Sequence, residues 1–199
     1  MAIRVSSWED LYKVVEVEAM PWFSPDLDED LDRALAELAI TNGHFLDIGT
    51  GPATQAIVLA KRGFKVTATD ISETAIEKGR DRASHERLII DFKQDDIVTS
   101  HLRRKFDLAF DRGCFHVLIP KKRAKYRDIV SRLIKPGGYL FLKSFSYKEP
   151  GKNGPYRFKP KEIEKTFKAQ FDILSIKDTT FKGNRKPNPK ALFCVMRKI

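Results

Sequence analysis

The sequence predicts an α/β fold in which helices cover both faces of a mostly parallel, doubly wound sheet. Between residues 44 and 146, strand-like apolar runs alternate with amphipathic helical segments, which is the pattern of parallel strands joined by crossover helices. A glycine-rich turn follows the first of these runs. The last two runs are joined only by GNRKPNPK, a link too short for a crossover helix. They are therefore expected to pair as an antiparallel hairpin at the sheet edge.

The first element is a mostly helical region, residues 8–42. Its DEDLDRALAELA stretch places Leu31, Leu35 and Leu38 on one helix face and acidic residues in the first turn, where they complement the helix dipole. Ser72 is expected to cap a later helix. The expected strands are 44–48, 64–70, 88–95, 106–111, 139–146, 171–181 and 191–199, and the later helices are 53–63, 72–84, 121–134 and 161–169.

Composition predicts one compact domain that spans residues 1–199, since 42% of the residues are hydrophobic and 11% aromatic. No secretion signal or membrane-spanning run is visible, and the two cysteines form neither a metal-ligand pattern nor a disulfide framework. A cytoplasmic protein without a membrane anchor is expected. The net charge of +10 would attract nucleic acid or an acidic protein, but no aromatic residues alternate with the basic clusters. A nucleic-acid partner is therefore not favoured, and the oligomeric state stays open.

The glycine turn, FLDIGTGPAT at residues 45–54, is expected to bind a ligand at the carboxyl end of its strand. Gly49 and Gly51 allow close approach of the backbone. Position 54 is Thr where a dinucleotide site has a third glycine, and no Lys-Ser/Thr pair follows as in a P-loop. Asp47 would repel a pyrophosphate but attract an ammonium or sulfonium group. The turn therefore favours a cationic ligand without phosphate, such as S-adenosylmethionine.

Two further acids follow strands. Asp70 lies nineteen residues after Gly51, at the end of the second strand, where a carboxylate can accept from both ribose hydroxyls. Its alternative role is to help cap the following helix. Asp96 follows the third strand and could accept from the exocyclic amine of adenine, with Ile97 covering the ring, while Asp95 is the competing assignment.

These features together resemble the class I S-adenosylmethionine-dependent methyltransferases. The family motifs stand here as DIGTG (47–51), TD (69–70), QDD (94–96) and KPGG (135–138). The resemblance implies a Rossmann-like sheet of seven strands whose last strand is antiparallel, and S-adenosylmethionine as the methyl donor with S-adenosylhomocysteine as the product. The implied cofactor contacts are Asp47, Gly49, Thr50, Gly51, Asp70, Ile71, Asp96, Ile97, Asp111, Gly113 and Trp22.

Two stretches narrow the resemblance. DRGCFHVL, after the fourth strand, and the N-terminal WEDLYKVVEVEAMPWFSP are similar to the corresponding parts of thiopurine, halide and thiol methyltransferases. They imply a small-molecule acceptor of thiol, halide or metalloid type. Residues 1–42 would form a helical lid over it, and residues 43–199 the cofactor-binding core. The aromatic residues expected around the acceptor are Trp8, Tyr12, Trp22, Phe115, Phe145 and Tyr147.

The chemistry requires alignment of nucleophile, methyl group and leaving sulfur, and no metal. If the acceptor must lose a proton, His116 is the candidate base in the DRGCFHVL loop, with a packing role as the alternative. Asp111 could hold the positive end of the cofactor or only order its loop. The alternative functions are methylation of protein lysine or RNA through the basic surface, and a non-catalytic cofactor-binding module.

Overall fold

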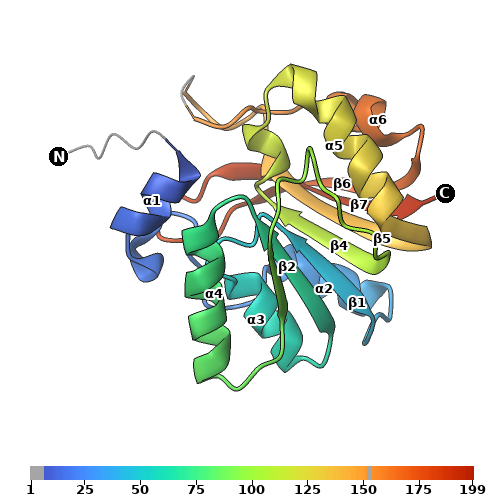
Figure 1. Ribbon diagram of the computed structural model, residues 1–199. Helices are drawn as coiled ribbons and strands as arrows, with labels where there is room; N and C mark the ends of the chain where they lie inside the picture. The colour runs from blue at the N-terminus through green and yellow to red at the C-terminus, as the bar shows by residue number, and fades with distance from the viewer. Residues whose placement is uncertain (1–6, 152–153) are drawn as a thin grey trace.

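The computed structural model describes residues 7–151 and 154–199. Strands of one sheet lie between two layers of helices (Figure 1). The helices are α1 (Trp8–Val14), α2 (Glu29–Glu37), α3 (Thr54–Lys61), α4 (Glu73–His85), α5 (Pro120–Leu133) and α6 (Pro160–Phe167). The strands are β1 (His44–Ile48), β2 (Lys65–Asp70), β3 (Asp91–Gln94), β4 (Phe106–Arg112), β5 (Ile134–Phe145), β6 (Phe171–Thr180) and β7 (Lys190–Lys198).

The sheet has the order β3-β2-β1-β4-β5-β7-β6. Strands β1 to β5 pair in parallel, and β7 is antiparallel to both of its neighbours, β5 and β6. The predicted fold class and the C-terminal hairpin are confirmed. Strand order reverses between β1 and β4, so the loops that follow these two strands meet at the point where open α/β sheets bind ligands.

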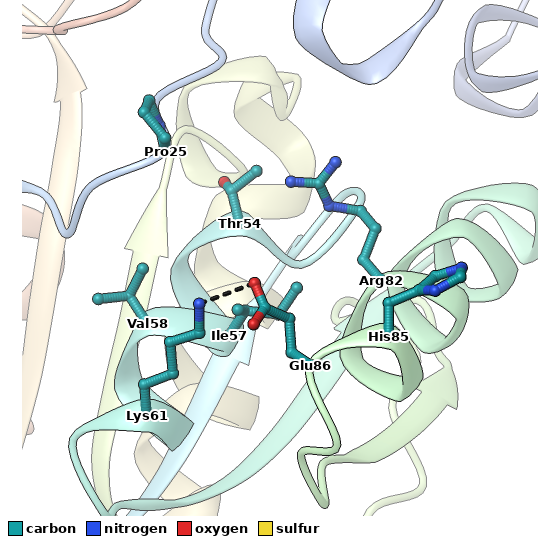
Figure 2. Close-up of a pocket in the computed structure, with 8 residues that line it drawn as sticks. All are labelled: Pro25, Thr54, Ile57, Val58, Lys61, Arg82, His85 and Glu86. Carbon is teal, nitrogen blue, oxygen red and sulfur yellow. Dashed lines mark hydrogen bonds and ion pairs between the residues drawn. The ribbon is translucent and has the colours of Figure 1, made fainter.

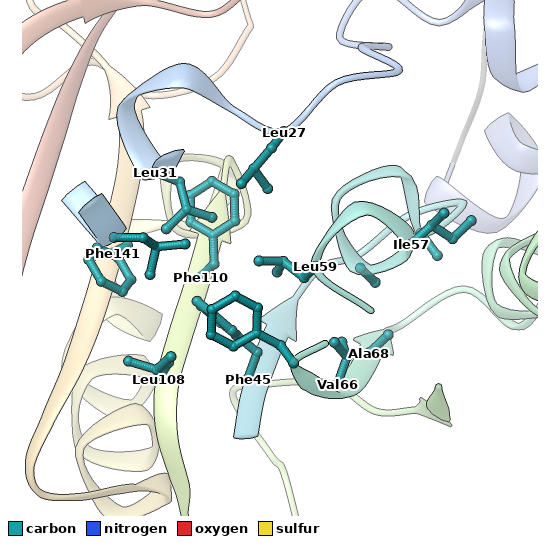
Figure 3. Packing of buried hydrophobic residues seen from close by; sticks show 14 of the residues in the cluster. Leu27, Leu31, Phe45, Ile57, Leu59, Val66, Ala68, Leu108, Phe110 and Phe141 are labelled. Carbon is teal, nitrogen blue, oxygen red and sulfur yellow. The ribbon is translucent and has the colours of Figure 1, made fainter. Parts of the chain in front are cut away.

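Alternation along the strands divides the apolar core into two parts. One part packs α2, α3 and α4 against strand residues such as Phe45, Val66 and Phe110 (Figure 3). The other packs α5 and α6 against Leu46, Ala109 and other residues of the opposite face. Because successive strand side chains point to opposite faces, one set of strands supports both helical layers.

Helix α2 belongs to the sandwich rather than to the lid. The sequence places it within the lid at residues 1–42, but Leu31 and Leu35 pack in the core part that contains Phe45 and Phe141. The apolar helix face was predicted, but not the surface that it covers. The segment above the sheet edge therefore consists of α1 and the short 3-10 turn Val17–Ala19 with the residues that follow it.

Hydrogen bonds on two sides fasten this segment to the core. Helix α1 lies beside α4, where the Glu9 carboxylate accepts hydrogen bonds from the hydroxyls of Ser72 (2.7 Å) and Thr74 (2.6 Å). On the other side, the Asn184 side chain in the β6–β7 loop donates to the carbonyl of Met20 (3.0 Å). The C-terminal hairpin thus helps to hold the N-terminal segment over the sheet.

In the described residues, no helix is long and apolar enough to cross a membrane.

Candidate functional site

The glycine turn between β1 and α3 has the backbone conformation that its sequence predicts. Gly49 and Gly51 have φ values of +65° and +53°, in the left-handed region that favours glycine. A Cβ at Gly49 would lie 2.9 Å from the Cβ of Cys114, and one at Gly51 would lie 2.8 Å from the Tyr12 hydroxyl. The N–H of Thr50 donates to the carbonyl of Thr69 (2.8 Å), which ties the turn to β2.

Asp47, at the end of β1, is buried beneath this turn. Its side chain is 3% exposed and accepts a 2.6 Å hydrogen bond from the Thr50 hydroxyl. Burial raises the pKa of the Asp47 carboxyl to about 7; the Thr50 bond opposes the shift, and the charges of Asp111 and Asp70 add to it. A cation bound nearby would therefore stabilise the ionised form of Asp47.

Asp70 ends β2 and links it to both neighbouring turns. One carboxylate oxygen accepts from the Gly51 N–H (2.8 Å) and the other from the Ser72 N–H (3.0 Å). A carboxylate can accept about four hydrogen bonds, so Asp70 can accept a further one from a ligand. Burial raises the pKa of Asp70, although its backbone hydrogen bonds oppose the shift. Ser72 caps α4 by accepting from the Ala75 N–H, as predicted.

Asp111, at the end of β4, organises the loop that follows it. One oxygen accepts from the N–H groups of Gly113 and Cys114, and the other from the Phe115 N–H and the Tyr126 hydroxyl (2.5 Å). These four bonds occupy the usual accepting capacity of a carboxylate. Burial raises its pKa to about 6, against the effect of these hydrogen bonds. Asp111 can therefore act on a ligand through its charge and through the loop.

Cys114 shows that acids from different strands converge here. Its thiol packs on Gly49, and burial, followed by the charges of Asp111, Asp70 and Asp96, raises its pKa well above the usual value. We call Asp47, Asp70 and Asp111 the acid group. None of them forms an ion pair within the described ranges 7–151 and 154–199. The site thus concentrates negative charge around the glycine turn.

The residues expected near adenine occupy different environments. Asp96 is partly buried and accepts from the Val98 N–H (3.0 Å), whereas one oxygen of Asp95 is buried with no partner in the described chain. Ile97 is 5% exposed and packs in the core beneath α5 and α6, while Ile71 is 52% exposed beside Asp70. Asp96 acts electrostatically on Cys114, and the unpartnered oxygen of Asp95 keeps Asp95 as the competing candidate for the adenine amine.

His116 is enclosed by aromatic rings. Its ring lies against those of Phe145 and Phe181, with centroid separations of 4.7 and 5.5 Å. Nδ1 accepts from the Phe145 N–H (3.1 Å), so the neutral ring carries its proton on Nε2. Burial lowers its pKa to about 3. In this state neither ring nitrogen is free to accept a proton, and these contacts favour the packing role.

The other aromatic residues expected around an acceptor are divided between core and surface. Phe115 is fully buried against Tyr126, Phe158 and Phe167 and so lies in the core. Trp22 is partly buried, and its ring meets that of Trp8 edge to face at 6.0 Å. Trp8 also lies against Tyr12 at 6.5 Å, and Tyr12 contacts Gly51, so this aromatic group reaches the glycine turn through Tyr12.

A buried ion cluster, defined as Asp28, Asp30, Arg112 and Lys143, was missed by sequence reasoning. The Lys143 ammonium donates to Asp28 (2.7 Å) and Asp30 (2.7 Å), and Arg112 Nε donates to Asp28 (2.9 Å). Arg112 also donates to the carbonyls of Trp22 (3.0 Å) and Lys182 (2.5 Å). A single lysine inside the apolar run YLFLKSF was the available signal, because a charge in a buried strand needs partners.

An open pocket lies elsewhere on the surface. It measures about 380 Å³ between α3 and α4, and its lining consists of Pro25, Thr54, Ile57, Val58, Lys61, Arg82, His85 and Glu86 (Figure 2). An ion pair between Lys61 and Glu86 (2.8 Å) crosses it. None of the acids that surround the glycine turn lines this pocket. In the described residues, no three metal-ligating side chains gather in one place.

Comparison with known proteins relates this geometry to one family. The family described as a methyltransferase domain matches residues 45–138. An uncharacterized methyltransferase of Schizosaccharomyces pombe is 34% identical over 113 residues, which cover 56% of this chain and 78% of that protein. A probable thiol methyltransferase of Arabidopsis thaliana is 29% identical over 174 residues, which cover 86% of this chain and 76% of that protein.

Solved structures share the fold. A methyltransferase from Methanosarcina mazei matches with a TM-score of 0.76 and 20% identity, over 87% of this chain and 99% of that one. TehB from Haemophilus influenzae matches with a TM-score of 0.74 and 19% identity, over 87% of this chain and 63% of that one. With the sequence relatives, the glycine turn and the acids at the strand ends, these likenesses lead to one conclusion: the chain belongs to the S-adenosylmethionine-dependent methyltransferases.

Proposed function

We propose that this chain is a cytoplasmic enzyme that transfers the methyl group of S-adenosylmethionine to a small-molecule acceptor. The observation that carries the proposal is the acid group, which lies around one glycine turn without a basic partner in the described residues. Buried carboxylates of this kind require a cation or a proton. S-adenosylmethionine has an ammonium and a sulfonium group and no phosphate, so its charges complement the site.

The residues present fit the rest of the cofactor. Asp70 retains accepting capacity for the ribose hydroxyls beyond its bonds to the backbone. Asp96 would accept from the adenine amine, and the exposed side chain of Ile71 would cover the ring, with Ile97 supporting this wall from the core. The backbone of Gly49, Thr50, Gly51 and Gly113 would lie along the methionine tail. Trp22 would cover the site from the lid.

The bound cofactor supplies the methyl carbon for an in-line displacement. The chain's contribution is to bind, orient and exclude water. Asp47 and Asp111 would attract the positive end of the cofactor, and the four hydrogen bonds to Asp111 would fix the loop that separates cofactor from acceptor. Because this loop follows β4 and the glycine turn follows β1, both walls stand on adjacent parallel strands.

The acceptor is expected to be a soft nucleophile that needs no enzymatic base, with a small thiol as the first choice. His116 supports this choice, since its Nδ1 accepts from the backbone and burial lowers its pKa to about 3. A thiol loses its proton far more readily than an alcohol and can react as the thiolate without a strong base. The similarity to a probable thiol methyltransferase over most of the chain agrees with this acceptor class.

The test follows a labelled methyl group from S-adenosylmethionine. The purified protein is incubated with single thiols, halide salts and phenols, and separately with a cell extract that is afterwards divided into small molecules, protein and RNA. Label is expected in the thiol products and in the small-molecule fraction, and excess S-adenosylhomocysteine should suppress it. Transfer to phenols alone would contradict the thiol assignment, and no transfer to any fraction would contradict the enzyme proposal.

A macromolecular acceptor is the second candidate, and it is favoured by the basic surface of α5 and α6. The exposed lysines there form no ion pair within the described ranges, and they are Lys121, Lys122, Lys125, Lys159, Lys161, Lys165 and Lys168. Such a surface can attract RNA or an acidic protein. Entry of the label mainly into RNA or protein lysine in the same extract would favour this candidate over a small molecule.

A further inference from the structure

Tyr12 places a hydroxyl group directly over the glycine turn. It lies in α1, its side chain is 5% exposed, and a Cβ at Gly51 would come within 2.8 Å of its hydroxyl oxygen. Across the described residues, no hydrogen-bond partner of this hydroxyl is found. A tyrosine so deeply buried normally pairs its hydroxyl, so this one is available to a ligand.

Electrostatics keep this hydroxyl protonated. Burial raises the pKa of Tyr12, and the nearby Asp70 and Cys114 add to the shift. The neutral phenol can therefore donate a hydrogen bond. The neighbouring carboxylates of the acid group can only accept hydrogen bonds when ionised, so the Tyr12 hydroxyl differs from them as a donor.

Helix α1 is fixed before any ligand is present. Glu9, three residues before Tyr12, accepts from the hydroxyls of Ser72 and Thr74 at the start of α4. These two hydrogen bonds lower the pKa of Glu9 to about 2. The Lys78 ammonium donates to the carbonyl of Val15 (3.2 Å) at the other end of α1. The Tyr12 hydroxyl is thus held at a set place relative to the glycine turn.

A second source of donors lies next to it. Helix α3 begins at Thr54, three residues after Gly51, and its N-cap residue Ala53 provides no side-chain hydrogen bond. The first N–H groups of a helix lack partners within it and favour an anion. Of these N–H groups, that of Ala56 interacts with the Asp47 carboxylate. The N–H groups of Thr54 and Gln55 remain, and they follow closely after Gly51, the residue that the unpartnered Tyr12 hydroxyl contacts.

Other donors near the site are already engaged. The Thr50 hydroxyl donates to Asp47, and the Tyr126 hydroxyl donates to Asp111. The cations Arg112 and Lys143 are held by the ion cluster. The methionine tail of S-adenosylmethionine carries a carboxylate as well as an ammonium group, and the acid group suits only the latter. The carboxylate needs a donor on this wall.

We propose that the Tyr12 hydroxyl, together with the start of α3, binds the carboxylate of the cofactor's methionine tail. The inference rests on the proposed function and adds a specific polar contact from the lid. The lid helix then does more than cover the site, because it recognises the amino-acid end of the cofactor. Tyr12 would distinguish ligands with this carboxylate from adenosine derivatives that lack it.

The test compares Tyr12→Phe with the wild-type chain by calorimetry, using three ligands. S-adenosylhomocysteine carries the whole tail, its decarboxylated analogue lacks only the carboxylate, and 5′-methylthioadenosine lacks the amino-acid end. Loss of a hydrogen bond to a charged group should weaken S-adenosylhomocysteine about 10- to 100-fold. Affinity for the other two ligands should change less than about twofold, since the ring and its packing remain.

Tyr139→Phe is the matched control, because Tyr139 is a partly buried tyrosine at the opposite end of the sheet, paired with Leu108. It should leave all three affinities unchanged. An equal loss for all ligands in Tyr12→Phe, or no loss for S-adenosylhomocysteine, would overturn the assignment, and thermal unfolding verifies that the variant is folded. A wild-type chain that binds none of the ligands would instead overturn the proposed function.

Discussion

Two neighbouring regions at the carboxyl edge of the sheet differ in whether their buried carboxylates are paired with cations. Around the glycine turn, the acid group has no cation of its own in the described residues, and burial raises the pKa values of its members. In the ion cluster, Asp28 is equally enclosed, but Lys143 and Arg112 pair with it. Burial alone would raise the pKa of Asp28, yet these two cations outweigh it and the pKa is lowered.

The acids around the glycine turn thus need a cation from a ligand, whereas those of the ion cluster are paired with cations of the chain itself. An unpaired buried carboxylate costs free energy, which a bound cation can recover. In a buried ion pair the partner cation offsets this free-energy cost, and the pair connects the two chain segments that provide it. Arg112 and Lys143 connect β4 and β5 to the residues before α2, so the ion cluster stabilises the frame on which the cofactor region stands.

The largest effect is expected where the ion cluster is broken. Lys143→Met removes the buried ammonium and leaves Asp28 and Asp30 without their shared partner. Removal of one member of a buried pair costs about 3–5 kcal/mol, and the free energy of unfolding in urea should fall by that amount. Lys148→Met is the control, since its pair with Asp178 is about half exposed and should contribute less than about 1 kcal/mol. Equal losses in the two variants would show that the buried ion cluster contributes no more to stability than an exposed pair.

In the acid group, a substitution should act on the ligand rather than on the fold. Asp70→Ala removes the two acceptors proposed for the ribose hydroxyls, and affinity for S-adenosylhomocysteine should fall by about 1–3 kcal/mol. Asp172→Ala serves as the control because it changes an exposed acid on β6, the strand at one edge of the sheet. Calorimetry on folded variants measures both. Unchanged affinity in Asp70→Ala would contradict the ribose assignment, and a loss in Asp95→Asn but not in Asp96→Asn would reverse the adenine assignment.

Cofactor affinity should rise with pH through the range where Asp47 and Asp111 titrate, at about 7 and about 6. A cation favours their ionised forms, so binding below these values releases protons, and affinity should fall by up to about tenfold for each pH unit. Calorimetry in buffers of different ionisation enthalpy counts the protons. Asp47→Asn should flatten the upper part of the curve, and a pH-independent affinity in the wild-type chain would contradict this expectation.

Stability without ligand should change in the opposite sense. The pKa of Asp47 is raised from 3.8 to about 7, so the folded state binds this proton more tightly than the unfolded state. The contribution of Asp47 is complete below about pH 4 and is lost as the pH rises through about 7. Asp28, with a lowered pKa, contributes in the other direction and loses its contribution only as the medium becomes acidic. The free energy of unfolding, measured against pH, should therefore show the contributions of Asp47 and Asp28 with opposite signs.

The sequence predicted the fold and the acids of the cofactor region because both depend on local pattern. Asp47 and Asp70 each end a strand, and parallel strands bring such ends to one edge. The expected strand at 88–95 was too long, since β3 begins at Asp91 and Ile89 is 97% exposed. Three apolar residues in a row indicate a strand, but pairing with β2 decides where it begins.

The ion cluster and the role of α2 could not be predicted in the same way. Asp28 meets Arg112 and Lys143 across 84 and 115 residues of sequence, and no local pattern joins them. Phe115 lies in a loop expected to face the acceptor, but its side chain packs in the core, because Asp111 binds the backbone N–H groups of Gly113, Cys114 and Phe115. Side-chain direction in such a loop depends on hydrogen bonds that only the folded chain makes.

The smallest effect is expected at His116. His116→Gln retains an acceptor for the Phe145 N–H but removes the imidazole. A general base contributes about 100- to 10,000-fold to the rate, whereas a ring whose Nδ1 is already occupied should contribute far less. With a thiol acceptor, kcat should therefore fall well under 100-fold and its pH profile should keep its shape. Loss of the rate by 100-fold or more, with disappearance of one limb of that profile, would restore His116 as the base and place a proton transfer on the acceptor side of the site.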